Sequence, residues 1–137
     1  MSKTVKSIDR VIAVCVISLF ILVTGCSKTA PMVTPKFQVP VSDTKRIHEV
    51  VKTALINRRW VILKNEPNAI EASYTRGNQY VAHIRVSHVG RQITISHVDS
   101  HDMLYSQGSA GPVIHRWYNT WVQNLERDIQ VAIGSGV

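Results

Sequence analysis

The sequence predicts one α+β domain in which a helix, four antiparallel strands and a second helix follow one another. Apolar residues recur at helical spacing over residues 43–57 and again from Ile114 to Ile129. Between these stretches, four segments alternate apolar and polar side chains and are separated by turn residues. This order predicts a two-layer sandwich over residues 42–133, with both helices on one face of a four-stranded meander and the other face in solvent.

The first helix is expected over residues 43–57. Ser42 is suited to cap its N-terminus, and Asp43 places a carboxylate in the first turn. Its apolar stripe repeats at i, i+3, i+4, i+7 and i+8 and consists of Ile47, Val50, Val51, Ala54 and Leu55. This spacing indicates a helix that buries one side.

The strands are expected as two hairpins. The first joins residues 60–63 to residues 70–75 through a turn at residues 65–68. The second joins residues 80–88 to residues 93–98, with Val89-Gly90 as a two-residue loop. That loop would pair Ile84 with Ile95 and Ala82 with His97 on the apolar face. On the polar face it would pair Arg85 with Thr94 and His83 with Ser96.

The last third of the chain predicts a loop followed by the strongest helical pattern. Residues 99–111 form the expected loop, and Pro112 suits the first turn of the helix that follows. The helix has its apolar stripe at Ile114, Trp117, Tyr118, Trp121, Val122, Leu125 and Ile129. His115 and Asn119 lie one turn apart beside this stripe and are expected to hold the preceding loop by hydrogen bonds. Residues 134–137 are a short flexible tail.

The N-terminal residues 1–25 have the pattern of an export signal. Three basic residues are followed by an uncharged run over residues 11–23 and then by Thr24-Gly25. That run is shorter than the roughly 20 residues needed to cross a bilayer core. The tetrapeptide Val23-Thr24-Gly25-Cys26 resembles the lipobox of bacterial lipoproteins. The resemblance implies cleavage between Gly25 and Cys26, with a diacylglyceryl group on the Cys26 sulfur and acylation, typically by palmitate, of the new amine.

The segment between the signal and the domain, residues 26–41, contains Pro31, Pro35 and Pro40 and shows neither helical nor alternating spacing. It is expected to be a semi-extended spacer, in which proline-rich chain gains about 3.1 Å per residue. Ser27 follows the cysteine, where an aspartate tends to retain lipoproteins in the inner membrane of Gram-negative bacteria. The resemblance therefore favours the outer membrane, with the domain facing the periplasm.

Composition limits the domain to one core without internal disulfides. Removal of residues 1–25 from the 137-residue chain leaves 112 residues, enough for one compact domain. The chain holds two cysteines, and Cys15 lies within the signal, so Cys26 is left without a partner. After processing, 13 basic and eight acidic residues remain, a net charge of +5 with neutral histidines. These basic residues are scattered, which is typical of a solvated surface.

The final third of the sequence resembles a family of small proteobacterial lipoproteins. Their pattern is I-x-Y-x-D-S-x-x-L followed by I-H-x-x-Y-N-x-W-V-x-N-L, and here it corresponds to residues 93–104 and 114–125. His97 stands where the pattern has tyrosine, and Met103 stands before Leu104, where the family would be expected to have asparagine. The resemblance extends over most of residues 42–132. It implies an outer-membrane or periplasmic lipoprotein with an α+β domain, and it implies no substrate.

One cluster has the composition of a metal site. Along an extended strand His97, Asp99 and His101 would point in one direction, a donor set found at metal centres. A satisfied histidine at the end of the apolar face and an aspartate in a turn explain the same residues more simply. Neither a G-x-S-x-G nucleophile motif nor an H-E-x-x-H motif occurs.

These patterns predict a non-enzymatic envelope lipoprotein held on the membrane by its N-terminal lipid. No cofactor beyond the covalent lipid on Cys26 is expected, and export makes nucleic acid an unsuitable partner. The expected partner is an envelope protein or an anionic polymer. It would bind the polar sheet face around His83, Arg85, Thr94 and Ser96, or the loop over residues 99–111. The alternative is a metal-dependent or hydrolytic periplasmic enzyme that uses His97, Asp99 and His101.

Overall fold

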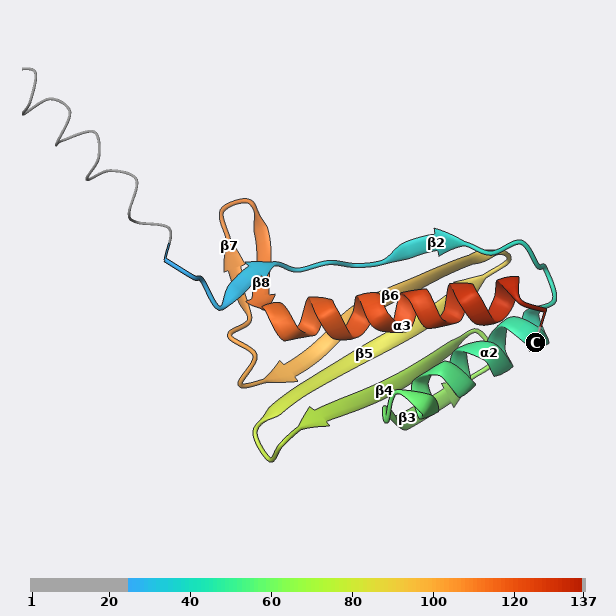
Figure 1. Cartoon of the computed structure of the whole chain (residues 1–137), viewed down its shortest axis with the longest axis horizontal. Helices are drawn as coiled ribbons and strands as arrows, with labels where there is room; N and C mark the ends of the chain where they lie inside the picture. The colour runs from blue at the N-terminus through green and yellow to red at the C-terminus, as the bar shows by residue number, and fades with distance from the viewer. Residues whose placement is uncertain (1–24, 137) are drawn as a thin grey trace, which may run out of the picture.

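The computed structural model describes residues 25–136, so the expected signal segment lies outside the described residues except for Gly25. Two helices and eight strands form the domain (Figure 1). In chain order they are β1 (Thr29–Pro31), β2 (Lys36–Gln38), α2 (Thr44–Asn57), β3 (Val61–Glu66), β4 (Ala69–Arg76), β5 (Tyr80–Val89), β6 (Gln92–His101), β7 (Ser106–Gly108), β8 (Gly111–His115) and α3 (Arg116–Gly134). The predicted α+β class is confirmed.

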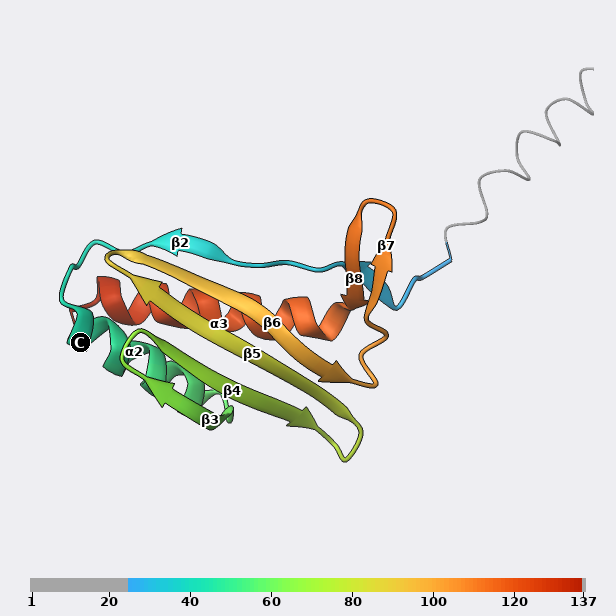
Figure 2. The same cartoon turned by 180° about the vertical axis from the view of Figure 1, so that it is seen from behind.

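The strands form two antiparallel sheets, where the sequence predicted one sheet of four strands. The larger sheet has the order β2-β6-β5-β4-β3, and the smaller has the order β1-β8-β7. The meander β3 to β6 is the predicted one, and β2 adds a fifth strand at its edge by pairing with β6. Both helices lie on the same face of the larger sheet, and the opposite face is uncovered (Figures 1 and 2).

The segment expected to be a spacer belongs to the fold. Strand β1 pairs with β8, and β2 pairs with β6. Val39 is buried in the core, and Phe37 packs against it. Helix α3 also holds this segment through Asn119. Its side chain accepts a hydrogen bond from the Val33 amide at 3.0 Å and donates one to the Pro31 carbonyl at 2.9 Å. The prolines therefore mark short edge strands, where a missing amide is tolerated.

The helix boundaries differ from the prediction by a few residues. Asp43, and not Ser42, caps α2, because its carboxylate accepts hydrogen bonds from the amides of Lys45 and Arg46. Residues 111–115 form strand β8, so Pro112 does not lie in a helix and α3 begins only at Arg116. The imidazole of His115 caps α3 by accepting a hydrogen bond from the Trp117 amide.

The hairpin of β5 and β6 has a register different from the predicted one. The two turn residues are Gly90-Arg91, and Gly90 has a φ of +56° that a glycine at the first turn position adopts freely. Ile84 therefore pairs with His97, two positions beyond the predicted Ile95. Because the shift is two residues, every side chain before Val98 keeps its predicted face.

The core lies between the larger sheet and the two helices. Its helix side comes from the predicted stripes of α2 and α3, except that Ile114 lies in strand β8 and not in the helix. Its sheet side comes from alternate residues of β4, β5 and β6. The fully buried members include Ile47, Val51, Leu55, Ile70, Ile84, Ile93, Ile95, Tyr118, Val122, Leu125 and Ile129. Trp117 and Trp121 are only partly buried at its margin. Within residues 25–136, no helix combines the length and apolar character needed to cross a bilayer.

Candidate functional site

The uncovered surface of the larger sheet, called here the open face, carries the four residues predicted for a partner site. His83 and Arg85 come from β5, and Thr94 and Ser96 come from β6. In the observed register, Arg85 pairs with Ser96, whose hydroxyl donates a hydrogen bond to the Arg85 carbonyl at 3.2 Å. Thr94 pairs with Ser87 and not with Arg85, and His83 pairs with Asp99 and not with Ser96. Because paired residues and alternate residues along a strand share a face, this register places all four on the open face.

Glu71 organises the charges of the open face, a role that no local sequence pattern predicts. It lies on β4 opposite Arg85 and is only 7% exposed, although no helix covers it. Its carboxylate is 2.9 Å from the Arg85 guanidinium, 3.2 Å from the Lys64 ammonium and 3.3 Å from His83 Nε2. Arg85 also reaches the carboxylate of Glu66 at 2.7 Å. The side chains of its partners therefore shield Glu71 from solvent.

The electrostatics of this cluster favour ionised groups. The hydrogen bond from Lys64, followed by that from Arg85, lowers the pKa of Glu71 against the opposing effect of desolvation. The carboxylates of Glu66 and Glu71 raise the pKa of Arg85. The positive charges of Lys64 and Arg85 are thus balanced by two carboxylates within the face. A planar guanidinium held between two carboxylates also has a fixed orientation.

The structure does not bring His97, Asp99 and His101 together as the metal hypothesis requires. A β-bulge at Val98 interrupts the pairing of β6 with β5, so that His97 lies opposite Ile84 and Asp99 lies opposite His83. His97 therefore faces the core, and Asp99 faces the open side. Among residues 25–136, no three His, Cys, Asp or Glu side chains are arranged to hold a metal ion.

His97 instead joins a packed cluster beside the core. Its ring stacks on Tyr105 with centroids 4.7 Å apart, and it meets Tyr118 edge to face at 5.5 Å. Its Nε2 is 3.0 Å from the Ser100 hydroxyl. Burial lowers the pKa of His97, which favours the neutral ring at neutral pH. The nearby acid of the predicted cluster, Asp99, accepts a hydrogen bond from the Ser100 amide, and it lies within strand β6 and not in the expected turn.

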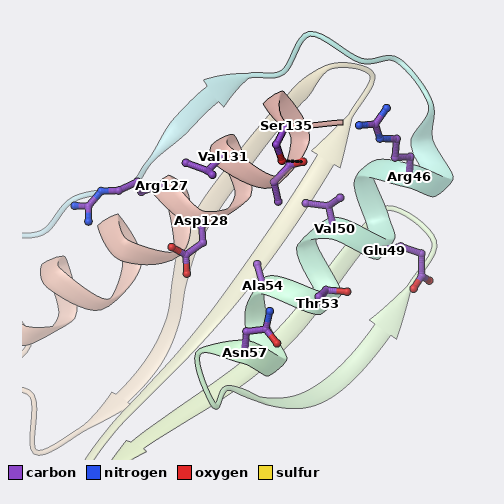
Figure 3. Close-up of a pocket in the computed structure, with 11 residues that line it drawn as sticks. Arg46, Glu49, Val50, Thr53, Ala54, Asn57, Arg127, Asp128, Val131 and Ser135 are labelled. Atoms are coloured by element: carbon purple, nitrogen blue, oxygen red, sulfur yellow. Dashed lines mark hydrogen bonds between the residues drawn. The ribbon is translucent and has the colours of Figure 1, made fainter. Parts of the chain in front are cut away.

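A groove between α2 and α3 forms a second surface that the sequence did not predict (Figure 3). Its volume is about 710 Å³. Val50 and Ala54 on α2 and Val131 on α3 make the lining apolar, and Val131 is 62% exposed. Asp128 lies at one side and binds the Arg58 guanidinium at 2.5 Å and 3.0 Å. The helical spacing placed Val50 and Ala54 in the apolar stripe of the first helix but did not predict a groove between the two helices.

A second hollow, of about 460 Å³, lies where the N-terminal segment meets the start of α3. Tyr80, His115 and Trp117 form its aromatic wall, with Tyr80 meeting Trp117 edge to face at 4.9 Å. The Arg76 guanidinium carbon lies 4.1 Å from the centre of the Trp117 ring. Lys28 and Gln79 complete the lining together with Asp102 and Leu104.

The loop beside this hollow is strained. Asp102 and Leu104 both have a φ of +54°, a left-handed conformation that costs a leucine roughly 1–2 kcal/mol. Met103 between them is 1% exposed, and its carbonyl accepts a hydrogen bond from the His115 amide at 2.7 Å. Burial of Met103 holds Leu104 outward, where it is 54% exposed.

Neither a family model nor a curated protein matches this sequence. The resemblance to small proteobacterial lipoproteins stays a prediction, and the geometry of the described residues carries the functional argument.

Proposed function

We propose that the chain is a membrane-anchored envelope lipoprotein whose domain is a non-enzymatic binding module facing the periplasm. The organised polar surface around Glu71 and Arg85 on the open face is the observation that carries this proposal. A sheet face left without a covering layer, with its charges held in fixed positions, suits recognition of a partner of matching polarity.

The proposed anchor is the lipid on Cys26. This cysteine is exposed, and it follows the lipobox-like residues Val23-Thr24-Gly25. Two or three acyl chains hold a protein stably on a membrane, because one buried methylene contributes about 0.8 kcal/mol. In a Gram-negative host, Ser27 favours the outer membrane over the inner membrane as the destination.

The charge balance of the open face favours a protein partner over an anionic polymer. Lys64 and Arg85 are already paired with Glu66 and Glu71, so they offer little free positive charge to a polyanion. Several of the other side chains on the open face are short and polar, among them Ser73, Ser87, Thr94 and Ser96. A partner would therefore be an envelope protein that matches polar groups and does not depend on strong net charge.

Photocrosslinking in the native envelope tests this proposal. A crosslinking residue at Thr94 should capture a discrete envelope protein. Thr94→Arg adds bulk to the open face without removing a member of the charge cluster, and it should abolish a crosslink made from Ser96. Charge reversal at Arg85 combined with His83→Ala should also abolish the crosslink made from Ser96. Lys45→Glu on the exposed side of α2 is the matched control and should leave the crosslink unchanged. Unchanged capture in both open-face variants would contradict the proposal.

A further inference from the structure

We propose that the end of the domain next to Cys26 lies directly on the membrane, where anionic phospholipid headgroups contact Lys28 and Arg76 and Leu104 enters the interface. This surface, called here the anchor end, comprises Lys28, Arg76, Leu104, Tyr105 and the hollow lined by Trp117. The inference rests on the proposed lipidation of Cys26 for its biological setting. Its surface chemistry is independent of that lipid.

The chain becomes fixed to the domain immediately after Cys26. The Ser27 carbonyl accepts a hydrogen bond from Arg116 Nε at 2.6 Å and another from the same guanidinium. The Lys28 carbonyl accepts a hydrogen bond from the Arg116 amide at 3.0 Å, and Thr29 begins strand β1. Consecutive Cα atoms are about 3.8 Å apart, so a lipid on Cys26 has almost no slack. The anchor end must therefore stay close to the bilayer surface.

The loop of β6 and β7 presents apolar side chains at this same end. Leu104 is 54% exposed and Tyr105 is 42% exposed. Leu104 lines the hollow together with Lys28, which brings the loop and the N-terminal segment to one surface. Its left-handed backbone and the buried Met103 hold it in place, so insertion requires no new ordering of the loop. A tyrosine beside an aliphatic residue is typical of the boundary between water and lipid.

Charge at the anchor end fits an anionic surface. Lys28 lines the hollow, and Arg76 lies over the Trp117 ring that forms its wall. Asp102 is the acidic residue among the side chains that line the hollow, and His101 Nε2 lies 3.7 Å from its carboxylate. Basic side chains beside an exposed leucine combine headgroup attraction with apolar insertion.

This placement sets the orientation of the whole domain. Helix α3 has 19 residues and starts beside the anchor end, so it extends about 28 Å away from it. The turn between β5 and β6 and the C-terminal part of α3 lie together at the opposite end of the long axis (Figure 1). The open face would stand to the side of the axis and remain accessible. The groove between α2 and α3, which the C-terminal part of α3 lines, would lie far from the bilayer.

Hydrogen exchange on vesicles tests the inference. The protein is extracted from membranes and reconstituted into vesicles of neutral phosphatidylcholine or of phosphatidylcholine with anionic phosphatidylglycerol. Backbone amides of residues 102–105 should exchange about fivefold more slowly on the anionic vesicles. One basic residue near such a surface contributes about 1 kcal/mol, and about 1.4 kcal/mol corresponds to a tenfold change in an equilibrium constant. Amides of residues 89–91, at the opposite end, should not change.

Matched variants separate contact from folding. Leu104→Asn introduces a residue that tolerates positive φ, so the loop should keep its conformation. This variant and Lys28→Gln should both lose the slower exchange on anionic vesicles. Val89→Asn removes another exposed aliphatic side chain, at the far end, and should keep the protection. Equal exchange of residues 102–105 on both vesicles overturns the inference. Flotation with neutral vesicles in high salt reports membrane binding by the acyl chains alone. A protein that does not float under these conditions contradicts lipidation. The exchange result on anionic vesicles then still tests headgroup contact.

Discussion

The guanidinium of Arg116 binds the main-chain carbonyl of Ser27, which ties the first residue after the proposed lipid anchor to the start of α3. A free spacer would let the domain move some tens of ångströms from the membrane. The observed attachment instead joins the anchor, strand β1 and helix α3 into one end of the molecule. The proposed position of the domain on a membrane therefore follows from contacts inside the fold.

Asn119→Ala should loosen this attachment. The Asn119 amide satisfies the Val33 amide and the Pro31 carbonyl, and leaving such groups unpaired costs about 1–3 kcal/mol. Urea unfolding should show this loss, and amides of residues 29–33 should exchange faster. Gln123→Ala, at an exposed position one turn further along α3, is the control and should change stability by less than about 0.5 kcal/mol. Equal stability of the two variants would contradict the assigned role.

His88 should make the fold sensitive to mild acid. It is 1% exposed, its Nε2 lies 3.0 Å from His48 Nδ1, and burial followed by the charge of His48 lowers its pKa from 6.5. The unfolded chain therefore binds the proton first, so stability is complete above about pH 6.5 and falls as the pH drops below it. His88→Leu should reduce this loss in unfolding experiments between neutral and mildly acidic pH. A wild-type stability independent of pH across this interval would contradict the assignment.

Glu71 should contribute a second loss of stability at lower pH. Its folded-state pKa lies below the ordinary value of 4.5, chiefly through Lys64 and then Arg85. The stabilising effect is present above that ordinary value and is lost as the pH falls through the folded-state pKa. Glu71→Gln should lower stability at neutral pH and remove this acid-dependent step. Glu49→Gln on the exposed side of α2 offers a control that should retain the step.

Leu104 should be a position where stability and membrane contact oppose each other. Because its φ of +54° is unfavourable for leucine, Leu104→Asn should raise the free energy of unfolding by about 1 kcal/mol. The same substitution should abolish protection on anionic vesicles. Leu63→Asn is the comparison, since Leu63 is 52% exposed but lies in strand β3. If Leu104→Asn lowers the free energy of unfolding as much as Leu63→Asn does, the result contradicts an exchange of stability for membrane contact at Leu104.

Local sequence patterns predicted the helices and the meander because these elements depend on spacing along the chain. The stripe from Ile47 to Leu55 and the alternation along β5 both survive in the structure. Strands β1 and β2 could not be predicted, since three-residue edge strands carry no periodicity and take their pairing from distant partners. The register of β5 and β6 depended on whether Gly90 came first or second in the turn, which composition alone leaves open.

The candidate site was predicted in part. Alternation placed His83, Arg85, Thr94 and Ser96 on one surface, and the structure keeps them there. Alternation also suggested that His97 and Asp99 share a direction, and the bulge at Val98 removes that relationship. The burial of Glu71 escaped prediction because it depends on Lys64 and Arg85 from neighbouring strands. The anchor end could not be predicted for the same reason, because Lys28 and Leu104 come together only through tertiary structure.

The intact mass of the protein extracted from membranes shows whether a lipid on Cys26 anchors the domain. We expect a mature chain that begins at Cys26 and carries a diacylglyceryl group together with an amide-linked acyl chain. A Cys26→Ser variant should lack both. A mature chain that begins at another residue, or one with an unmodified Cys26, would contradict the claim that a lipid on this cysteine holds the domain on the membrane.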